Sequence, residues 1–152
     1  MSQQLTFHNV RLLNRNFQGR HSQFDQHQPR DKRRSFTFLI PNSRIEDCVR
    51  AGLIQSDHEL VAGIKVKVRP ANLPPHDYFK NLFNIDCLYH DRWFMLNESN
   101  MAMLDDSTAI VEAETLIINL YPWSVNGRSG TSAYLEYAKL TYAEGELEEP
   151  PF

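Results

Sequence analysis

Two aromatic residues, Tyr121 and Trp123, stand two positions apart in a stretch, residues 115–123, that is typical of a β-strand. Because alternate side chains of a strand share one face, both rings are expected side by side, with Leu116, Ile118 and Leu120 on the other face, toward a core. Stacking of a base on such a ring contributes about 1–3 kcal/mol and tolerates any base. The pattern predicts a base-stacking platform; rings that close the end of a barrel are the alternative.

The stretch 14–34 interleaves basic residues with isolated phenylalanines, and residues 59–69 alternate Ile64, Val66 and Val68 with basic side chains. Cations neutralise phosphates and ring faces stack on bases, so this mixture is typical of a groove for single strands. A solvated loop with Phe17 in the core, and ordinary polar-out alternation, are the alternatives. The predicted phosphate contacts are Arg15, Arg20, Lys32, Arg33, Arg34, Lys65, Lys67, Arg69 and Arg128. The predicted stacking residues are Phe17, Phe24, Tyr121 and Trp123.

Motifs for catalysis and metal binding are the alternatives to this interpretation. The sequence contains no Gly-rich phosphate loop, nucleophile elbow or HExxH motif. Cys87 and His90, with Cys48 and His58, could form a zinc site, but structural zinc sites usually show two tight pairs. Scattered carboxylates could hold a divalent metal in a nuclease, at Asp86, Asp91, Asp105, Asp106, Glu112 and Glu114. We predict no enzyme activity, no cofactor and no bound metal.

The last residues, 144–152, form an acidic segment that ends in Pro150, Pro151 and Phe152. Such a composition cannot pack into a core, so the segment is predicted to be disordered. A terminal ring and carboxylate suit a partner pocket with an apolar floor and a basic rim. The predicted partner-binding residues are Glu146, Glu148, Glu149, Pro150, Pro151 and Phe152; an acidic terminus without function is the alternative.

Charge is unevenly distributed along the 152 residues, whose formal net charge is −3. Residues 1–69 hold twelve Lys and Arg against six Asp and Glu, and residues 70–143 hold four against nine. This split predicts a basic binding surface and an acidic appendage that competes for it. With two cysteines, no apolar run long enough for a membrane span and no secretory signal, a cytoplasmic protein without membrane contact is expected.

Short strands dominate the predicted elements. Strands are expected over 4–13, with a bend near Asn9, and over 35–40, 59–69, 115–123 and 131–142, with one or two more within 78–96. Ser43 and Glu46 fit a capping box that begins a short helix ending at Gly52, a further helical turn is expected within 104–113, and Asn126-Gly127 predicts a hairpin. The fold class is mostly β: an OB-fold-like antiparallel barrel over 1–143, with a short helix, a long basic loop and a disordered acidic tail over 144–152.

Several motifs together resemble the single-stranded-DNA-binding proteins of tailed bacteriophages. They are Asn16-Phe17-x-Gly19, Arg34-Ser-Phe36-x-Phe38-x-Ile40, Tyr121-x-Trp123-x-Val125-Asn126-Gly127-Arg128-x-Gly130-x-x-Ala133-Tyr134-Leu135, and the acidic tail. The tail also resembles those of bacterial single-strand-binding proteins, with glutamates and a double proline in place of an aspartate run. The resemblance implies an OB fold, coating of single-stranded DNA in phage replication, recombination and repair within the host cytoplasm, and recruitment of replication or recombination proteins by the tail. A homo-oligomer is compatible with it.

Three other functions stay open at the level of sequence. An RNA-binding OB module would prefer RNA oligonucleotides, although no motif here reads a 2′-hydroxyl. A metal-dependent nuclease or its accessory protein would degrade oligonucleotides with magnesium. An interaction protein that only displays its tail would have no affinity for nucleic acid.

Overall fold

The computed structural model describes residues 3–20, 33–66, 83–89, 91–94, 96, 100–107 and 110–142. The strands are β1 (Gln3–Asn16), β2 (Ser35–Leu39), β3 (Val61–Lys65), β4 (Ile85–Tyr89), β5 (Arg92–Phe94), β6 (Val111–Val125) and β7 (Arg128–Tyr142). The helices are the 3₁₀ turn η2 (Asn42–Arg44), α1 (Ile45–Ala51) and α3 (Met101–Asp106). The longest described helix, α1, has seven residues, too few to cross a bilayer.

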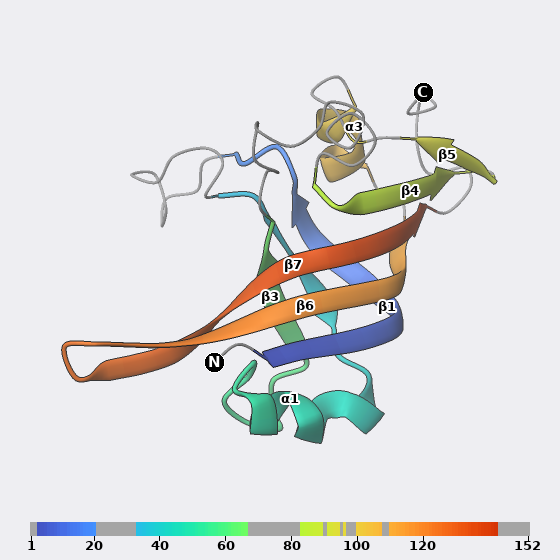
Figure 1. Ribbon diagram of the computed structural model, residues 1–152. Helices are drawn as coiled ribbons and strands as arrows, with labels where there is room; N and C mark the ends of the chain where they lie inside the picture. The colour runs from blue at the N-terminus through green and yellow to red at the C-terminus, as the bar shows by residue number, and fades with distance from the viewer. Residues whose placement is uncertain are drawn as a thin grey trace.

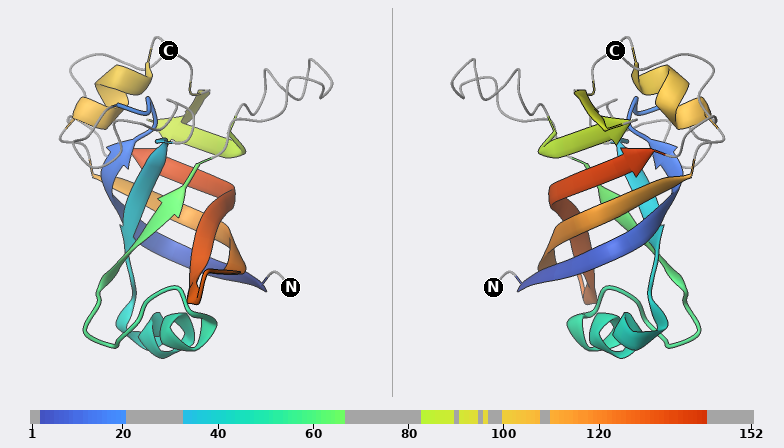
Figure 2. Two further views of the ribbon diagram at one scale, coloured as in Figure 1. Left: turned by 90° about the vertical axis from the view of Figure 1, so that its left-hand side faces the viewer. Right: turned by 90° about the vertical axis from the view of Figure 1, so that its right-hand side faces the viewer.

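Five strands close into a ring. β1 pairs antiparallel with β2 and β6, β2 with β3, and β6 with β7, and a parallel pairing of Lys65 with Tyr134 joins β3 to β7. The ring wraps around one core, with α1 at one end and α3 at the other (Figures 1 and 2). β4 pairs parallel with the end of β7, and β5 pairs antiparallel with β4. The mostly β, OB-fold-like architecture is confirmed, although two of its pairings are parallel.

Alternation of apolar residues explains how these strands fill the core. Phe36 and Phe38 of β2 point inward, and Phe38 packs against Phe7 of β1 with ring centroids 4.9 Å apart. In β1 the inward positions shift between Phe7 and Val10, and Asn9 takes a positive φ of 56° there. The irregularity predicted near Asn9 is therefore confirmed: the left-handed residue lets the apolar side chains change face while the pairing with β6 keeps its register.

The short helix begins later than its predicted cap. Ser43 lies inside the 3₁₀ turn, and α1 starts at Ile45 with no side-chain hydrogen bond at its N-cap. The capping box is therefore wrong. The predicted stop is correct, since Gly52 follows the helix with φ of 83° and its N–H donates to the Val49 carbonyl.

The last two strands form a hairpin longer than the sequence predicts. Asn126 and Gly127 both have positive φ, 50° and 78°, and pairing continues up to Val125 with Arg128. The sequence predicts strands over 115–123 and 131–142, with residues 124–130 as the loop between them. In the structure the loop is only the two-residue turn, Asn126-Gly127. β1 leaves β6 at Leu120, so residues 121–132 project from the ring as a two-stranded ribbon, called here the arm (Figure 1).

Candidate nucleic-acid interface

Aromatic rings lie on one face of the arm and of the adjoining part of β7. The side chains of Tyr121 and Trp123 are 40% and 44% exposed, whereas Leu120 between the same strands is buried. Tyr134 of β7 lies edge-on to Tyr121, with ring centroids 5.7 Å apart and planes at 66°. The two predicted platform residues therefore do not close the end of the barrel; their rings face solvent.

The Trp123 ring lies over Gly130, its cross-strand partner. A Cβ atom placed on Gly130 would stand 2.7 Å from Cζ2 of the indole, so the ring can occupy this position only if residue 130 is glycine. The absence of a side chain at Gly130 thus leaves room for the indole over the neighbouring strand, where Trp123 remains 44% exposed. An exposed indole offers a ring on which a base can stack.

A lysine stands beside these rings. The single β3–β7 pairing puts Lys65 next to Tyr134, and its Nζ lies 5.9 Å from the ring centroid. We call Lys65, Tyr121, Trp123 and Tyr134 the aromatic surface. Sequence reasoning does not identify Tyr134 as a member of this surface. The signal that could identify it is the hairpin register set by Asn126-Gly127, which pairs Tyr134 with Asn119.

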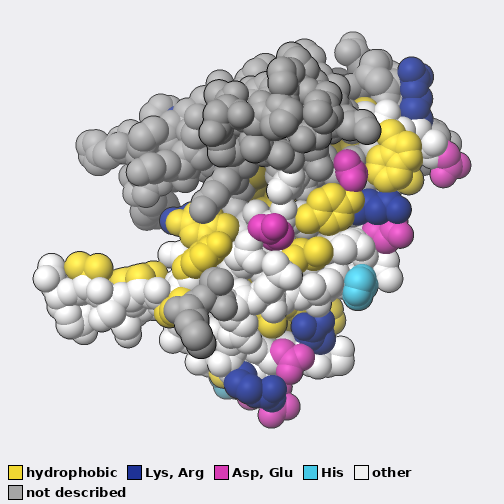
Figure 3. All heavy atoms as spheres, viewed as in Figure 1, with side chains coloured by type: hydrophobic (Ala, Val, Ile, Leu, Met, Phe, Trp, Pro, Cys, Tyr) yellow, Lys and Arg dark blue, Asp and Glu magenta, His cyan; other side chains and the backbone are white. Residues whose placement is uncertain are grey.

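Negative charge is absent from this part of the sequence. Residues 115–135 contain no Asp or Glu, and their one charged residue, Arg128, is exposed beside the turn at the tip of the arm. The next carboxylate, that of Glu136, accepts a hydrogen bond of 2.6 Å from the Asn119 amide. Figure 3 shows hydrophobic side chains along the arm and at its root, with no acidic side chain on the arm in this view.

Several predicted phosphate ligands instead hold the fold together. Arg34 is 3% exposed, donates hydrogen bonds to the Phe17 carbonyl and the Met101 sulfur, and lies over the Phe83 ring. Arg33 is also buried, and its Nε donates to the Gly19 carbonyl at 2.8 Å. The prediction that these two guanidinium groups contact phosphates is wrong, because the body of the protein already surrounds them.

Two further arginines contact the C-terminal end of α3 and the residue after it. Arg15 is half-buried and donates to the carbonyls of Leu104 and Ser107 at 3.0 Å each, so its predicted phosphate contact stays a prediction. Arg20 is half-exposed and forms an ion pair of 2.5 Å with Asp106, so its charge is largely offset. Both arginines therefore serve to dock α3 on the end of β1.

Phe17 is fully buried and packs against Phe36, with ring centroids 6.1 Å apart. Its predicted stacking on bases is wrong, because its ring belongs to the core, which was the stated alternative. Phe24, Lys32, Lys67 and Arg69 lie outside the described residues, as do Glu146, Glu148, Glu149, Pro150, Pro151 and Phe152. Of the predicted set, the structure brings together Lys65, Tyr121 and Trp123 at the root of the arm and leaves Arg128 exposed at its tip.

A half-buried carboxylate completes the contact between α3 and the end of β1. Asp105 accepts hydrogen bonds from the backbone N–H groups of Phe17 at 3.1 Å and Gln18 at 3.0 Å. Burial nonetheless raises the pKa of Asp105 above its ordinary value, although those hydrogen bonds and Arg20 act in the opposite direction. This carboxylate orients a turn and lies apart from the aromatic surface.

Metal-binding residues do not gather anywhere in the described ranges: no three His, Cys, Asp or Glu side chains there could share an ion. Cys48 and Cys87 are both buried free thiols, and burial raises the pKa of each. A thiol with a raised pKa is a poor metal ligand and nucleophile at neutral pH. Both cysteines act as core residues.

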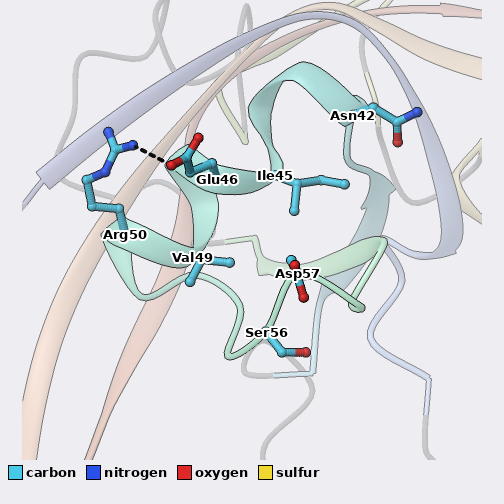
Figure 4. A pocket seen from close by; sticks show the side chains of 7 residues that line it. All are labelled: Asn42, Ile45, Glu46, Val49, Arg50, Ser56 and Asp57. Atoms are coloured by element: carbon cyan, nitrogen blue, oxygen red, sulfur yellow. Dashed lines mark ion pairs between the residues drawn. The ribbon is translucent and has the colours of Figure 1, made fainter.

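A pocket of about 830 Å³ lies on α1 (Figure 4). Ile45 and Val49 form its apolar part, and Glu46, Asp57 and Arg50 are its charged residues. Arg50 pairs with Glu46 at 3.7 Å, and Asp57 adds a second carboxylate to the described lining. Such a charge balance repels phosphate, and this pocket is not part of the interface.

No family model matches this chain, and no curated protein matches it. Among solved structures it is similar to the single-stranded DNA-binding protein from bacteriophage Enc34 in complex with ssDNA, with a TM-score of 0.50 and 12% identity. The match covers 97% of this chain and 88% of that one. The resemblance to the phage single-strand-binding proteins is therefore confirmed at the level of the fold.

Proposed function

We propose that this protein binds single-stranded DNA without strong sequence preference, by stacking bases on the aromatic surface and holding phosphates with Lys65 and Arg128. The observation that carries this proposal is a group of three rings, the exposed Tyr121 and Trp123 and the half-buried Tyr134, with Lys65 beside them and no acidic residue in the arm. Ring faces bind any base, and a duplex hides its bases inside its own stack. The surface therefore fits an unpaired strand.

The kind of partner is supported by the structural neighbour, which was solved with ssDNA bound. The match in fold covers 97% of this chain, which supports a strand path across one face of the ring. We further propose that the protein coats single strands during phage DNA replication, recombination and repair in the host cytoplasm. In this proposal it has no catalytic role, and residues 144–152 recruit replication or recombination proteins.

The test is fluorescence anisotropy of a labelled poly-thymidine oligonucleotide titrated with the full chain at two salt concentrations. A duplex and an RNA of the same length serve as comparisons. We expect tight binding to the single strand and weak binding to the duplex. The logarithm of affinity should fall with the logarithm of salt with a slope of about −0.7 for each phosphate neutralised.

Folded protein that binds no oligonucleotide at low salt would overturn the proposal. Clear preference for the RNA would instead assign the surface to an RNA-binding module.

A further inference from the structure

The register of the arm decides which backbone groups face its two edges. The turn Asn126-Gly127 has two residues, both with positive φ, so the residues on either side of it form a hydrogen-bonded pair. Hydrogen-bonded and non-hydrogen-bonded pairs then alternate along an antiparallel ribbon. The next pair, Ser124 with Ser129, is therefore not hydrogen-bonded within the ribbon. The same holds for Pro122 with Thr131, and the backbone groups of both pairs point outward.

The outward groups make the two edges unequal. On β6, Pro122 has no N–H, and a proline on an edge strand is a common means of preventing another strand from pairing there. On β7, Ser129 and Thr131 each keep an N–H donor and a C=O acceptor. Among the described residues, no backbone group outside the hairpin pairs with either of them, and β3 reaches β7 only at Tyr134. The β7 edge is therefore the one that can accept a strand.

The side chains of the β7 edge do not oppose an added strand. Residues 129–132 are Ser-Gly-Thr-Ser, all small and uncharged, whereas natural edges are usually protected by charged side chains. Gly52, at the end of α1, approaches the side chain of Thr131 on the face of the ribbon opposite Trp123. The arm itself extends away from the ring (Figure 1). The exposed backbone of this edge thus combines hydrogen-bonding capacity with little steric or electrostatic resistance.

We propose that two copies of this chain form a dimer by antiparallel pairing of their β7 edges, so that the two arms become one four-stranded ribbon. Identical antiparallel strands are related by a two-fold axis, and each donor of one copy meets an acceptor of the other. Recognition of an unlike peptide needs pockets for its alternate side chains, which this edge of small residues does not offer. In the paired ribbon both outer edges carry Pro122, so growth stops at two copies.

This pairing also joins the stacking faces of the two copies. Because the two-fold axis is perpendicular to the ribbon, the face that carries Tyr121 and Trp123 in one arm continues into the same face of the other. Trp123 lies over Gly130, the residue between Ser129 and Thr131 on the paired edge, so the two indoles lie on either side of the axis. The consequence for DNA rests on the proposed function: one single strand contacts both copies, and binding is cooperative.

Two proline variants test the edge. Ser129→Pro removes an outward N–H from the β7 edge, and its control Ser124→Pro removes the corresponding N–H from the β6 edge, at the cross-strand partner. Sedimentation equilibrium of the full chain without DNA, at micromolar to near-millimolar concentrations, measures the dissociation constant of the dimer. The wild type and S124P should dimerise reversibly. S129P should raise the dissociation constant about tenfold or more, because each dimer loses two backbone hydrogen bonds.

A second pair of variants keeps the backbone donors. Ser129→Lys brings the added charges of the two copies close together across the β7 edge, whereas Ser124→Lys adds the same charge at the other edge. At low salt S129K should stay monomeric at concentrations where S124K dimerises, and added salt should reduce this difference. A melting temperature near that of the wild type shows that each variant is folded.

A wild type that is monomeric at every concentration would overturn the pairing. So would folded S129P and S129K that dimerise as tightly as their controls, because the contact would then lie elsewhere. The DNA consequence is measured separately: a poly-thymidine that accommodates one copy should bind S129P and the wild type alike. One that accommodates two copies should bind the wild type and S124P cooperatively, but not S129P. Dimerisation without affinity for either oligonucleotide would contradict the proposed function and leave the pairing intact.

Discussion

Individual residues of the same type have opposite roles in this protein. Arg34 is buried against Phe17, Met101 and Phe83, whereas Arg128 is exposed beside the turn of the arm. A buried guanidinium is retained only when carbonyls and rings replace its water. The arginines therefore divide by location, and only an exposed one such as Arg128 can take the phosphate-binding role that we propose.

The two tryptophans provide a matched test at this scale. Trp123→Ala should weaken binding of single-stranded DNA by about 1–3 kcal/mol, because a stacking face is lost, with little change in the free energy of unfolding. Trp93 is a suitable control because it is also exposed, at 54%, and its ring centroid lies 5.3 Å from Nζ of Lys139. It belongs to β5, which is far from the arm (Figure 1). Trp93→Ala should leave affinity unchanged in the same anisotropy titration, and equal losses in both variants would contradict the assignment.

At the scale of elements, the arm is an unusual use of two strands. Both of its edges lack neighbours among the described strands, since β1 ends its pairing at Leu120 and β3 reaches β7 only at Tyr134. An isolated ribbon is marginally stable unless side chains pack across it. Trp123 over Gly130, together with the contact of Thr131 near Gly52, supplies that packing.

Gly130→Ala tests whether the position of the indole matters. The added methyl group would stand within 2.7 Å of the ring, which must swing away, and we expect weaker binding of single strands without deletion of any aromatic group. The loss should approach that of Trp123→Ala, about 1 kcal/mol or more. Red-shifted tryptophan emission would report the displaced ring.

Gly63→Ala is the control for this change, because it adds the same methyl group to β3, where the nearest atom, Cγ2 of Thr37, is 3.9 Å away. It should leave both affinity and emission unaltered. Wild-type affinity in G130A would show that the position of the Trp123 ring over Gly130 is not needed for binding.

At the scale of the whole molecule, the closed ring is tied to α3 by groups from distant parts of the chain. Asp105 accepts from Phe17 and Gln18, and Arg15 donates to Leu104. These contacts connect the end of β1 to the last helix before β6. The site lies elsewhere, so stability at this end and binding at the arm should respond to different variants.

The raised pKa of Asp105 predicts an unusual dependence of stability on pH. Its folded state holds the proton more tightly than the unfolded state, whose pKa is near 3.8, because burial disfavours the charge. The contribution of this group to the free energy of unfolding is therefore fully present below that pKa and is lost as pH rises through the raised folded value. A carboxylate whose folded-state pKa is lowered has the opposite effect, because its contribution to stability is lost as pH falls.

Urea unfolding of the wild type and Asp105→Asn, from about pH 3 to about pH 6, measures this effect. The wild type should lose stability relative to D105N as pH rises across the window, and the difference should then level off. The constant difference reflects the changed hydrogen bonds, so only the slope is diagnostic. A difference that does not vary with pH would contradict the raised pKa.

Local sequence determined the features that depend on neighbouring residues alone. The turn at Asn126-Gly127 follows from two residues that tolerate positive φ, and the shared face of Tyr121 and Trp123 follows from the two-residue period of a strand. The bend at Asn9 and the helix stop at Gly52 have the same origin. The capping box failed because a 3₁₀ turn took up the residues expected to form the cap.

Only the tertiary structure decided which charges and rings are free to bind. Arg34 and Phe17 look as available in sequence as Arg128 and Trp123, but contacts with residues as distant as Phe83 and Met101 enclose Arg34. Tyr134 becomes part of the aromatic surface because ring closure brings Lys65 beside it. Burial is a property of nonlocal packing, so residue type and spacing predicted the kind of surface, and the closed sheet selected its members.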